Sequence, residues 1–485
     1  MASLLRKNIW LIFILVLFLS FYFFVPSLYF SQDDFFHLKV SNPSEPRSNL
    51  FSLFYFRSYK ETGIYFYRPI FREFLFNIYS KFFGLNPLPF RITQLFIHLI
   101  NIVLTYILVV KISKDKIVGI IASLFFAISA ANVGVLSYLA GGIQASGMTM
   151  FALLTLILFW KFLESGRLKY SIFSFFFYLL SLASHELAMT LPFIMMSLLI
   201  LKKGFEVKNR VSKLLPFFIA SLILLLVEVF FISLPIGEKQ YGFSFSPARI
   251  LNSYVWYFVW SLGMPEMLLD FIGPGIKFNP NLMKFWGDYF KIIFPLFIFI
   301  SLLLLISLKN LFKQKLFWFF VFWFVVSIAP VVFLPLHRST YYLALSLPAL
   351  SGIIGLSFSY FYKWSKSLSY FFIISAVALS FVTILLSQKT YWAITRTRIA
   401  KRIILDIRKE YPQIPKGAII YIKNDPSYLK FSEEWGGTSK QASVILSGSD
   451  ALQLIYHDPT LKVFYEDLAI PRGVGVLPFT AKMSH

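Results

Sequence analysis

Residues 9–30 read IWLIFILVLFLSFYFFVPSLYF, and the polar stretch SQDDFFHL at 31–38 follows directly. An apolar run of about 20 residues is long enough to cross a bilayer and longer than the apolar core of a signal peptide. Arg6 and Lys7 precede the run, and no small-residue cleavage site follows it. The pattern predicts a retained first membrane helix with its N-terminus in the cytoplasm, which places the acidic stretch outside.

The composition of the whole chain is typical of a polytopic membrane protein. Hydrophobic residues make up 58% of the 485 residues, charged residues make up 14%, and the mean hydropathy is +0.70. A soluble domain is about half apolar and about one-quarter charged. The chain has no cysteine, which excludes disulfides, thiolate catalysis and cysteine-bound metals.

Apolar segments recur along the chain and, with the first helix, predict about eleven membrane crossings. The later segments cover residues 92–110, 116–133, 147–163, 169–184, 186–202, 213–235, 289–308, 316–335, 340–361 and 368–387. Every second loop is rich in Lys and Arg, and these loops are 111–116, 164–169, 202–213, 309–315 and 363–366. The opposite loops, around 134–146, 184–186 and 336–339, are nearly free of cations apart from Arg338. The bias assigns the basic loops to the cytoplasm, and it accounts for the net charge of +23 without nucleic-acid binding.

The predicted fold is an all-α polytopic membrane region at 1–388 followed by a small C-terminal domain. Two long external loops, 31–89 and 236–288, interrupt the membrane region. The first loop is expected to hold an interfacial helix at 71–83, where aromatic and charged residues alternate. The second is expected to hold a re-entrant or interfacial helix near 249–262.

The C-terminal residues 389–485 are mixed in polarity and long enough for a small α/β domain. They start with a basic stretch at 396–409 that predicts a helix, and the run AIIYI at 418–422 predicts a strand. An odd number of crossings places this domain outside the cytoplasm.

The acidic pair Asp33-Asp34 is the first candidate for chemistry. Adjacent residues point in different directions on a helix, so the two carboxylates are not expected to share one proton. One carboxylate is a candidate general base or a ligand for a divalent cation, and the other orients the loop. The alternative is a solvated helix cap. His37 lies one helical turn after Asp33 and either shares its face or is an interfacial histidine.

Several short motifs together resemble the membrane glycosyltransferases of GT-C type, in particular the protein O-mannosyltransferases and the aminoarabinose transferases of lipid A. The motifs are the acidic pair after the first helix, Tyr67-Arg68-Pro69-Ile70, the run 91–105 with Gln94, His98 and Asn101, and Ser184-His185-Glu186. The resemblance covers the layout of about residues 1–350. It implies a GT-C type fold and inverting transfer of a sugar, as by a mannosyltransferase, from a polyprenyl phosphate to an external acceptor. Asp33 matches the catalytic aspartate of the family by order. This chain has Asp-Asp where the families often have Asp-Glu, so the resemblance leaves open which residue is the base.

The leaving lipid phosphate in such a reaction needs cationic stabilisation, and the fork of an arginine matches phosphate oxygens. The candidates are Arg68, Arg72 and Arg338. Arg338 stands in LHRSTYY at 336–342, an external turn with little other charge. The alternative is that Arg338 only extends its side chain to the interface.

Four further residues are candidate substrate ligands, namely His37, His185, Glu186 and Tyr341. Glu186 has an alternative role as a helix cap. Glu228 is an intramembrane carboxylate, which marks either a functional site or a protonated contact between helices. His98 and Asn101 are expected to join helices.

Other patterns exclude several functions. The glycines of 141–147 lack the lysine of a phosphate-binding loop, so nucleotide binding is not expected. These small residues are expected to permit close helix packing or to make room for a substrate. The run Glu433–Gly437 matches the Trp-Trp-Asp-Tyr-Gly element of oligosaccharyltransferases only in part, so that activity is not carried over. No spacing fits a zinc site, and we expect no cofactor and no metal, with a divalent cation as the alternative.

The expected partners are a polyprenyl-phosphate-linked sugar, a protein, glycan or lipid acceptor, and membrane lipids, with no nucleic acid. The alternative function is a transporter or flippase of a lipid-linked glycan. Polar residues gather at external helix ends rather than at mid-membrane, which favours the enzyme. The short N-terminus and the lack of cysteine in an external domain favour a bacterial plasma membrane.

Overall fold

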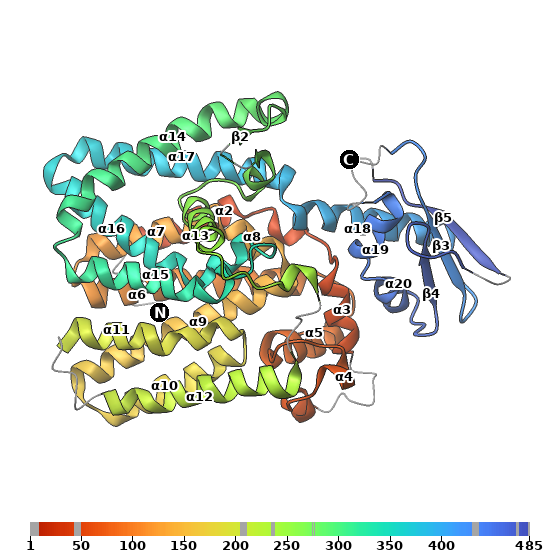
Figure 1. Cartoon of the computed structure of the whole chain (residues 1–485), viewed down its shortest axis with the longest axis horizontal. Helices are drawn as coiled ribbons and strands as arrows, with labels where there is room; N and C mark the ends of the chain where they lie inside the picture. Colours follow the sequence, from red (N-terminus) through yellow and green to blue (C-terminus); the bar gives the residue numbers. More distant parts are fainter. Residues whose placement is uncertain are drawn as a thin grey trace. The chain divides into compact units, whose positions relative to one another are not determined.

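The computed structural model describes residues 9–42, 50–203, 211–233, 238–273, 275, 277–428, 436–471 and 475–483. Helices account for most of them (Figure 1). Contacts divide the chain into two compact units. The first unit comprises Met1–Phe23, Phe54–Phe71 and Thr93–Tyr391, and the second comprises Phe24–Leu53, Arg72–Ile92 and Trp392–His485. The functional boundary predicted at residue 388 stays a prediction.

Apolar helices build the first unit, apart from the short polar helix α4 (Tyr59–Thr62) and one short hairpin formed by β1 (Ile272–Gly273) and β2 (Lys277–Phe278). The helices are α2 (Ile9–Phe21), α6 (Leu88–Ser113, whose first turn belongs to the second unit), α7 (Lys116–Ile128), α8 (Asn132–Ser137), α9 (Leu139–Ser165), α10 (Leu168–Leu182), α11 (Leu191–Lys203), α12 (Leu215–Leu226), α13 (Pro247–Ser261), α14 (Asn281–Leu311), α15 (Lys315–Val332), α16 (Leu347–Trp364) and α17 (Lys366–Thr390). The helix expected near 249–262 is α13.

Seven helical spans in the described part of the chain are long and apolar enough to cross a membrane. They are Ile9–Ser27, Leu88–Ser113, Leu139–Ser165, Val211–Ile232, Asn281–Leu311, Lys315–Val332 and Lys366–Thr390. Their surfaces carry large apolar side chains, such as Phe230 at 81% and Trp10 at 62% exposure, which fit contact with lipid. The chain is therefore an integral membrane protein. The prediction of a mostly helical membrane fold is confirmed, whereas the count of eleven crossings stays a prediction.

The structure corrects the prediction of a loop at 134–146. This segment is helical, since it contains α8 and the first turns of α9. The glycines of this segment permit close packing, as expected from the sequence. A Cβ atom on Gly142 would overlap the carbonyl oxygen of Val135, and one on Gly147 would overlap the ring of Phe71. Close approach thus outweighs the low helix propensity of glycine here.

The second unit combines short helices with a three-stranded parallel sheet. The helices are α3 (Asp33–Val40), α5 (Leu75–Phe83), α18 (Trp392–Glu410), α19 (Thr438–Ile445) and α20 (Asp450–Ile455). The strands β3 (Ile419–Lys423), β4 (Lys462–Tyr465) and β5 (Val476–Thr480) lie in the order β4-β3-β5. Ile420 and Ile422 of the central strand are fully buried, because alternate side chains of a strand point to one face. The predicted basic helix, strand and C-terminal α/β fold are confirmed.

Candidate functional site

The two aspartates of the second unit have different surroundings. Both lie in the first turn of α3, where carboxylates interact favourably with the helix dipole. Asp34 is 1% exposed, and its Oδ2 accepts a hydrogen bond of 3.0 Å from the backbone N–H of Ser31. Asp33 is exposed. One carboxylate is thus fixed inside the unit while its neighbour faces outward.

A buried arginine supports Asp34. Arg91, at the start of α6, is fully buried and donates to the carbonyl oxygen of Tyr29 at 2.9 Å. It also interacts electrostatically with Asp34. An opposite charge at a buried carboxylate favours its ionised form. Arg91 was quoted in the motif at 91–105, but the sequence carried no signal that it lies near the acidic pair.

The helix α3 is held by the C-terminal part of the same unit. The backbone N–H of Gln32 donates to the carbonyl oxygen of Ile445 at 2.8 Å, and Lys39 forms an ion pair of 2.6 Å with Asp450. His37 is 8% exposed and stands edge-on to the ring of Phe76. These contacts fix the acidic pair on a folded α/β support.

Arg72, another residue of the second unit, already has a carboxylate partner. Its Nε and one terminal nitrogen donate to the same oxygen of Glu73 at 2.8 and 2.6 Å. Arg72 is 5% exposed. Much of its charge is therefore neutralised within the pair.

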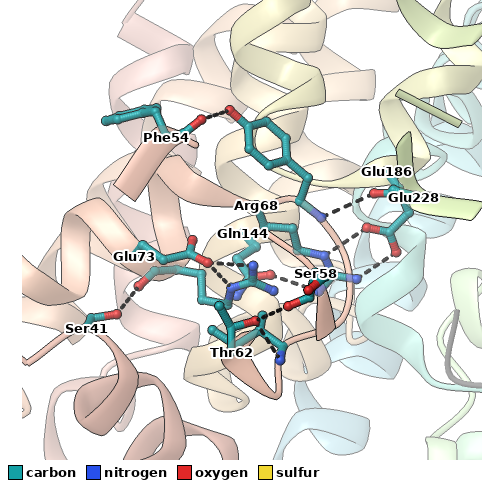
Figure 2. A network of polar contacts seen from close by, with 12 residues as sticks. Ser41, Phe54, Ser58, Thr62, Arg68, Glu73, Gln144, Glu186 and Glu228 are labelled. Carbon is teal, nitrogen blue, oxygen red and sulfur yellow. Dashed lines mark hydrogen bonds and ion pairs between the residues drawn. The ribbon is translucent and has the colours of Figure 1, made fainter. Parts of the chain in front are cut away.

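The first unit contains a separate polar cluster around Arg68. Figure 2 shows the guanidinium of Arg68 directed at Glu186 and Gln144. Its Nε and one terminal nitrogen donate to the two oxygens of Glu186 at 2.8 and 2.6 Å, and the other terminal nitrogen donates to Gln144 Oε1 at 2.8 Å. This two-point contact is the strong geometry of an arginine–carboxylate pair.

Charges in the cluster shift the pKa values of its neighbours. Burial alone would raise the pKa of Glu186, but the charge of Arg68 lowers it to about 2. Burial and the repulsion of Arg68 lower the pKa of His185 to about 3. Burial, followed by the same repulsion, lowers the pKa of His337 to about 4. Near neutral pH the cluster therefore contains an ionised pair and two neutral imidazoles.

His185 presents a ring nitrogen without a hydrogen-bond partner in the described part of the chain. Its Nδ1 lies 3.3 Å from the backbone nitrogen of Leu187 and 3.3 Å from Oε2 of Glu186. The Nε2 atom is buried and has no hydrogen-bond partner among the described residues. The Nε2 of Gln144 is likewise buried and has no hydrogen-bond partner among these residues. An imidazole nitrogen and an amide nitrogen thus remain for a ligand beside the Arg68–Glu186 pair.

Aromatic side chains surround this polar centre. Tyr341 and Tyr342 pack with tilted rings whose centres are 4.1 Å apart, and Tyr342 stands edge-on to His185 at 6.2 Å. The hydroxyl of Tyr341 lies 3.4 Å from His337 Nε2. Tyr241 packs on His337 at 4.5 Å. The structure thus brings the predicted residues Arg68, His185, Glu186 and Tyr341 into one cluster.

Glu228 positions the loop that carries Arg68. It lies in the helical turn η6 (Val227–Ile232), is 3% exposed, and accepts from the backbone N–H of Tyr67 at 3.3 Å (Figure 2). Because Tyr67 directly precedes Arg68, this contact restrains the backbone of the motif. The sequence left Glu228 as either a functional site or a contact between segments, and the geometry favours the contact.

Arg338 differs from the other two candidate arginines. One terminal nitrogen donates to Asn252 Oδ1 at 2.6 Å, and within the described ranges no carboxylate pairs with it. Its Nε is buried and has no partner there. The turn after it is held by Glu266, which accepts from the backbone N–H and the hydroxyl of Thr340, both at 2.6 Å. The sequence placed Glu266 in the long external loop without assigning it this role.

Two further predictions concern a metal ion and the partial oligosaccharyltransferase element. Within the described residues, no group of three or more His, Cys, Asp or Glu side chains is placed to hold a metal ion, and metal independence stays a prediction. Glu433, Glu434 and Trp435 of the partial oligosaccharyltransferase element lie outside the described residues.

No protein-family model matches the chain, and no curated protein matches it significantly. Two crystal structures of the Archaeoglobus fulgidus oligosaccharyltransferase are similar to it. The form tethered by a disulfide to an acceptor peptide with the NVT sequon has a TM-score of 0.48 and 12% identity, over 96% of this chain and 65% of that chain. The apo form has a TM-score of 0.47 and 12% identity, over 95% and 64%. The chain thus spans less than two thirds of those structures. A likeness of this degree carries no argument about function, which has to rest on the residues of this chain.

Proposed function

We propose that the chain is a membrane glycosyltransferase of GT-C type. It moves a sugar, as a mannosyltransferase does, from a polyprenyl phosphate to a hydroxyl acceptor on the extracytoplasmic side of a bacterial plasma membrane. The observation that carries the proposal is the division within the acidic pair after the first membrane helix. Asp34 is buried and hydrogen-bonded, while its neighbour Asp33 is exposed. An exposed carboxylate on a fixed support suits a general base.

In the proposed reaction, Asp33 accepts the proton of the acceptor hydroxyl as that oxygen attacks the anomeric carbon. The bond between this carbon and the phosphate oxygen breaks, and the polyprenyl phosphate departs with the electron pair. Attack from the opposite face inverts the anomeric centre. Asp34, restrained by Ser31 and Arg91, keeps the first turn of α3 in place.

Arg338 is the strongest candidate to stabilise the departing phosphate. Glu186 and Glu73 partly neutralise Arg68 and Arg72, whereas Arg338 pairs with no carboxylate in the described part of the chain. Its planar guanidinium can donate two parallel hydrogen bonds to phosphate oxygens. Arg68 and Arg72 remain secondary candidates for the same role.

The cluster of the first unit is the proposed substrate-binding region. His185 offers the Nε2 atom, Glu186 offers carboxylate oxygens, and Tyr341 offers a hydroxyl group. Donors and acceptors of this kind recognise sugar hydroxyls. His37 of the second unit is the remaining proposed substrate ligand.

The proposal is tested with the full chain in detergent and a short-chain polyprenyl phosphate that carries a radiolabelled sugar. Mannose, glucose and aminoarabinose donors are each supplied with serine- and threonine-containing peptides, a glycan or a lipid as acceptor. We expect release of the polyprenyl phosphate and labelled acceptor with at least one combination, unaffected by a chelator. Asp33→Asn should abolish the release.

Asp288→Asn is the matched control, because Asp288 is a highly exposed aspartate, with 96% of its side chain accessible. It should retain full turnover. Full turnover in both Asp33→Asn and Asp34→Asn would refute the assigned base. In sealed vesicles, movement of the labelled donor across the bilayer with no release of phosphate would instead favour a flippase.

A further inference from the structure

A basic hollow lies in the second unit, apart from the residues assigned above. Its volume is about 390 Å³, and its lining includes Arg398, Lys401 and Arg402 of α18, together with Tyr29 and Asp406. Cations outnumber carboxylates three to one in this lining. The volume falls within the range of about 300–1,000 Å³ that is typical of small-ligand sites.

The three cations have no partner within the described ranges. None of them forms an ion pair there, and Asp406, although it lines the same hollow, pairs with none of them. Arg398 and Lys401 are exposed and Arg402 is half-buried. Unpaired like charges that converge on one hollow repel each other, so an anion bound there would stabilise the fold.

Chain connectivity places the hollow close to the membrane surface. Ser27 and Tyr29 belong to its rim, and the first membrane span ends at Ser27. Helix α18 starts at Trp392, two residues after the span Lys366–Thr390 ends. At about 1.5 Å per helical residue, its three cations lie no more than roughly 12–18 Å along the chain from the end of that span.

Aromatic residues at the start of α18 agree with an interfacial position. Tyr391 and Trp392 separate the membrane span from the cations, and Arg396 stacks over the ring of Trp392 at 5.1 Å. Tyrosine and tryptophan concentrate where a helix leaves the bilayer. Tyr29, which lines the hollow, carries a phenol hydroxyl, a neutral hydrogen-bond donor.

We infer that the hollow formed by Arg398, Lys401 and Arg402 binds the phosphate headgroup of an anionic phospholipid from the surrounding bilayer. The phosphate accepts hydrogen bonds from the two guanidinium groups and the ammonium group, and the acyl chains remain in the membrane. The site would couple the α/β support of the acidic pair to the membrane surface. This inference does not depend on the proposed transfer reaction, because it concerns lipid binding alone.

The test uses the full chain in dodecylmaltoside micelles doped with phosphatidylglycerol or with phosphatidylcholine. The readouts are the thermal unfolding midpoint and the lipid retained on the protein in native mass spectrometry. We expect phosphatidylglycerol to raise the midpoint and to be retained, and phosphatidylcholine to do neither. In the triple variant Arg398→Gln, Lys401→Gln, Arg402→Gln, the half-saturating amount of phosphatidylglycerol should rise on the order of a hundredfold.

The matched control is Lys416→Gln, Lys423→Gln, Lys462→Gln, which removes three cations of the same unit that do not line the hollow. It should respond to phosphatidylglycerol as the unmodified chain does, and Lys401→Gln alone should give an intermediate loss. An unchanged response of the first triple variant overturns the inference. Equal stabilisation by inorganic phosphate, or stabilisation by polyglutamate but not by phosphatidylglycerol, also overturns it.

Discussion

Replacing Glu186 by glutamine removes the carboxylate that holds Arg68. The pair has two hydrogen bonds of 2.8 and 2.6 Å, and its side chains are 14% and 19% exposed. Breaking a buried ion pair destabilises a protein by about 3–5 kcal/mol, because the other charge stays buried without its partner. This pair keeps some contact with water, so we expect a loss of about 3 kcal/mol in the free energy of unfolding.

A double-mutant cycle measures this coupling. Arg68→Gln, Glu186→Gln and the double variant are unfolded in mixed micelles with increasing dodecyl sulfate. Each single variant should lose about 3 kcal/mol, and the double variant should lose little more than either, because it leaves no unpaired charge. Asp288→Asn breaks the exposed Asp288–Lys291 pair of 3.2 Å and should cause no measurable change. Additive losses in the double variant, or a Glu186→Gln loss no larger than that of Asp288→Asn, would refute the reasoning.

Three other outcomes follow from the same structure. Glu266→Gln weakens the hydrogen bonds that hold Thr340, and with it the turn that follows Arg338. Because Arg338 is then less well positioned, the KM for the lipid donor should rise, with the amount of folded protein unchanged. Acidification from pH 6 to pH 5 should destabilise the protein by about 1.2 kcal/mol for each of His185 and His337. Both imidazoles stay neutral in the folded protein, since their pKa values are about 3 and 4, but become protonated when the chain unfolds. Gly142→Ala should lower the free energy of unfolding by about 1–3 kcal/mol, because the added methyl group meets the neighbouring backbone.

Each of these outcomes has its own control. Glu238→Gln changes a half-buried loop carboxylate and should leave the KM for the donor unchanged, whereas an unchanged KM in Glu266→Gln contradicts the positioning role. His185→Gln should reduce the slope of the unfolding free energy against pH, whereas His457→Gln should keep the full slope. Equal slopes in the two variants contradict the argument. Gly166→Ala tests strain at a helix end with open space around the Cβ position, and a larger loss there than at Gly142 contradicts the packing argument.

The local pattern of the sequence predicted much of the architecture. Apolar runs of bilayer length predict membrane helices wherever they occur, because lipid leaves a backbone no other hydrogen-bond partner. The basic start of α18 and the β-branched run of β3 likewise follow from neighbouring residues alone. The loop predicted at 134–146 was wrong, because this segment is helical and its glycines lie against Phe71 and Val135.

The sequence by itself thus determined the membrane class, the alternation of basic loops with loops poor in cations, and which polar residues were candidates for chemistry. Only the tertiary structure decided their partners. Arg68 meets Glu186 across 118 positions, and Thr340 meets Glu266 across 74. The tertiary structure also decided that Asp34 is buried while Asp33 is exposed. It likewise left Arg338 without a paired carboxylate within the described residues. Charge pairing and burial depend on distances between remote segments, and those distances are set by packing rather than by local periodicity.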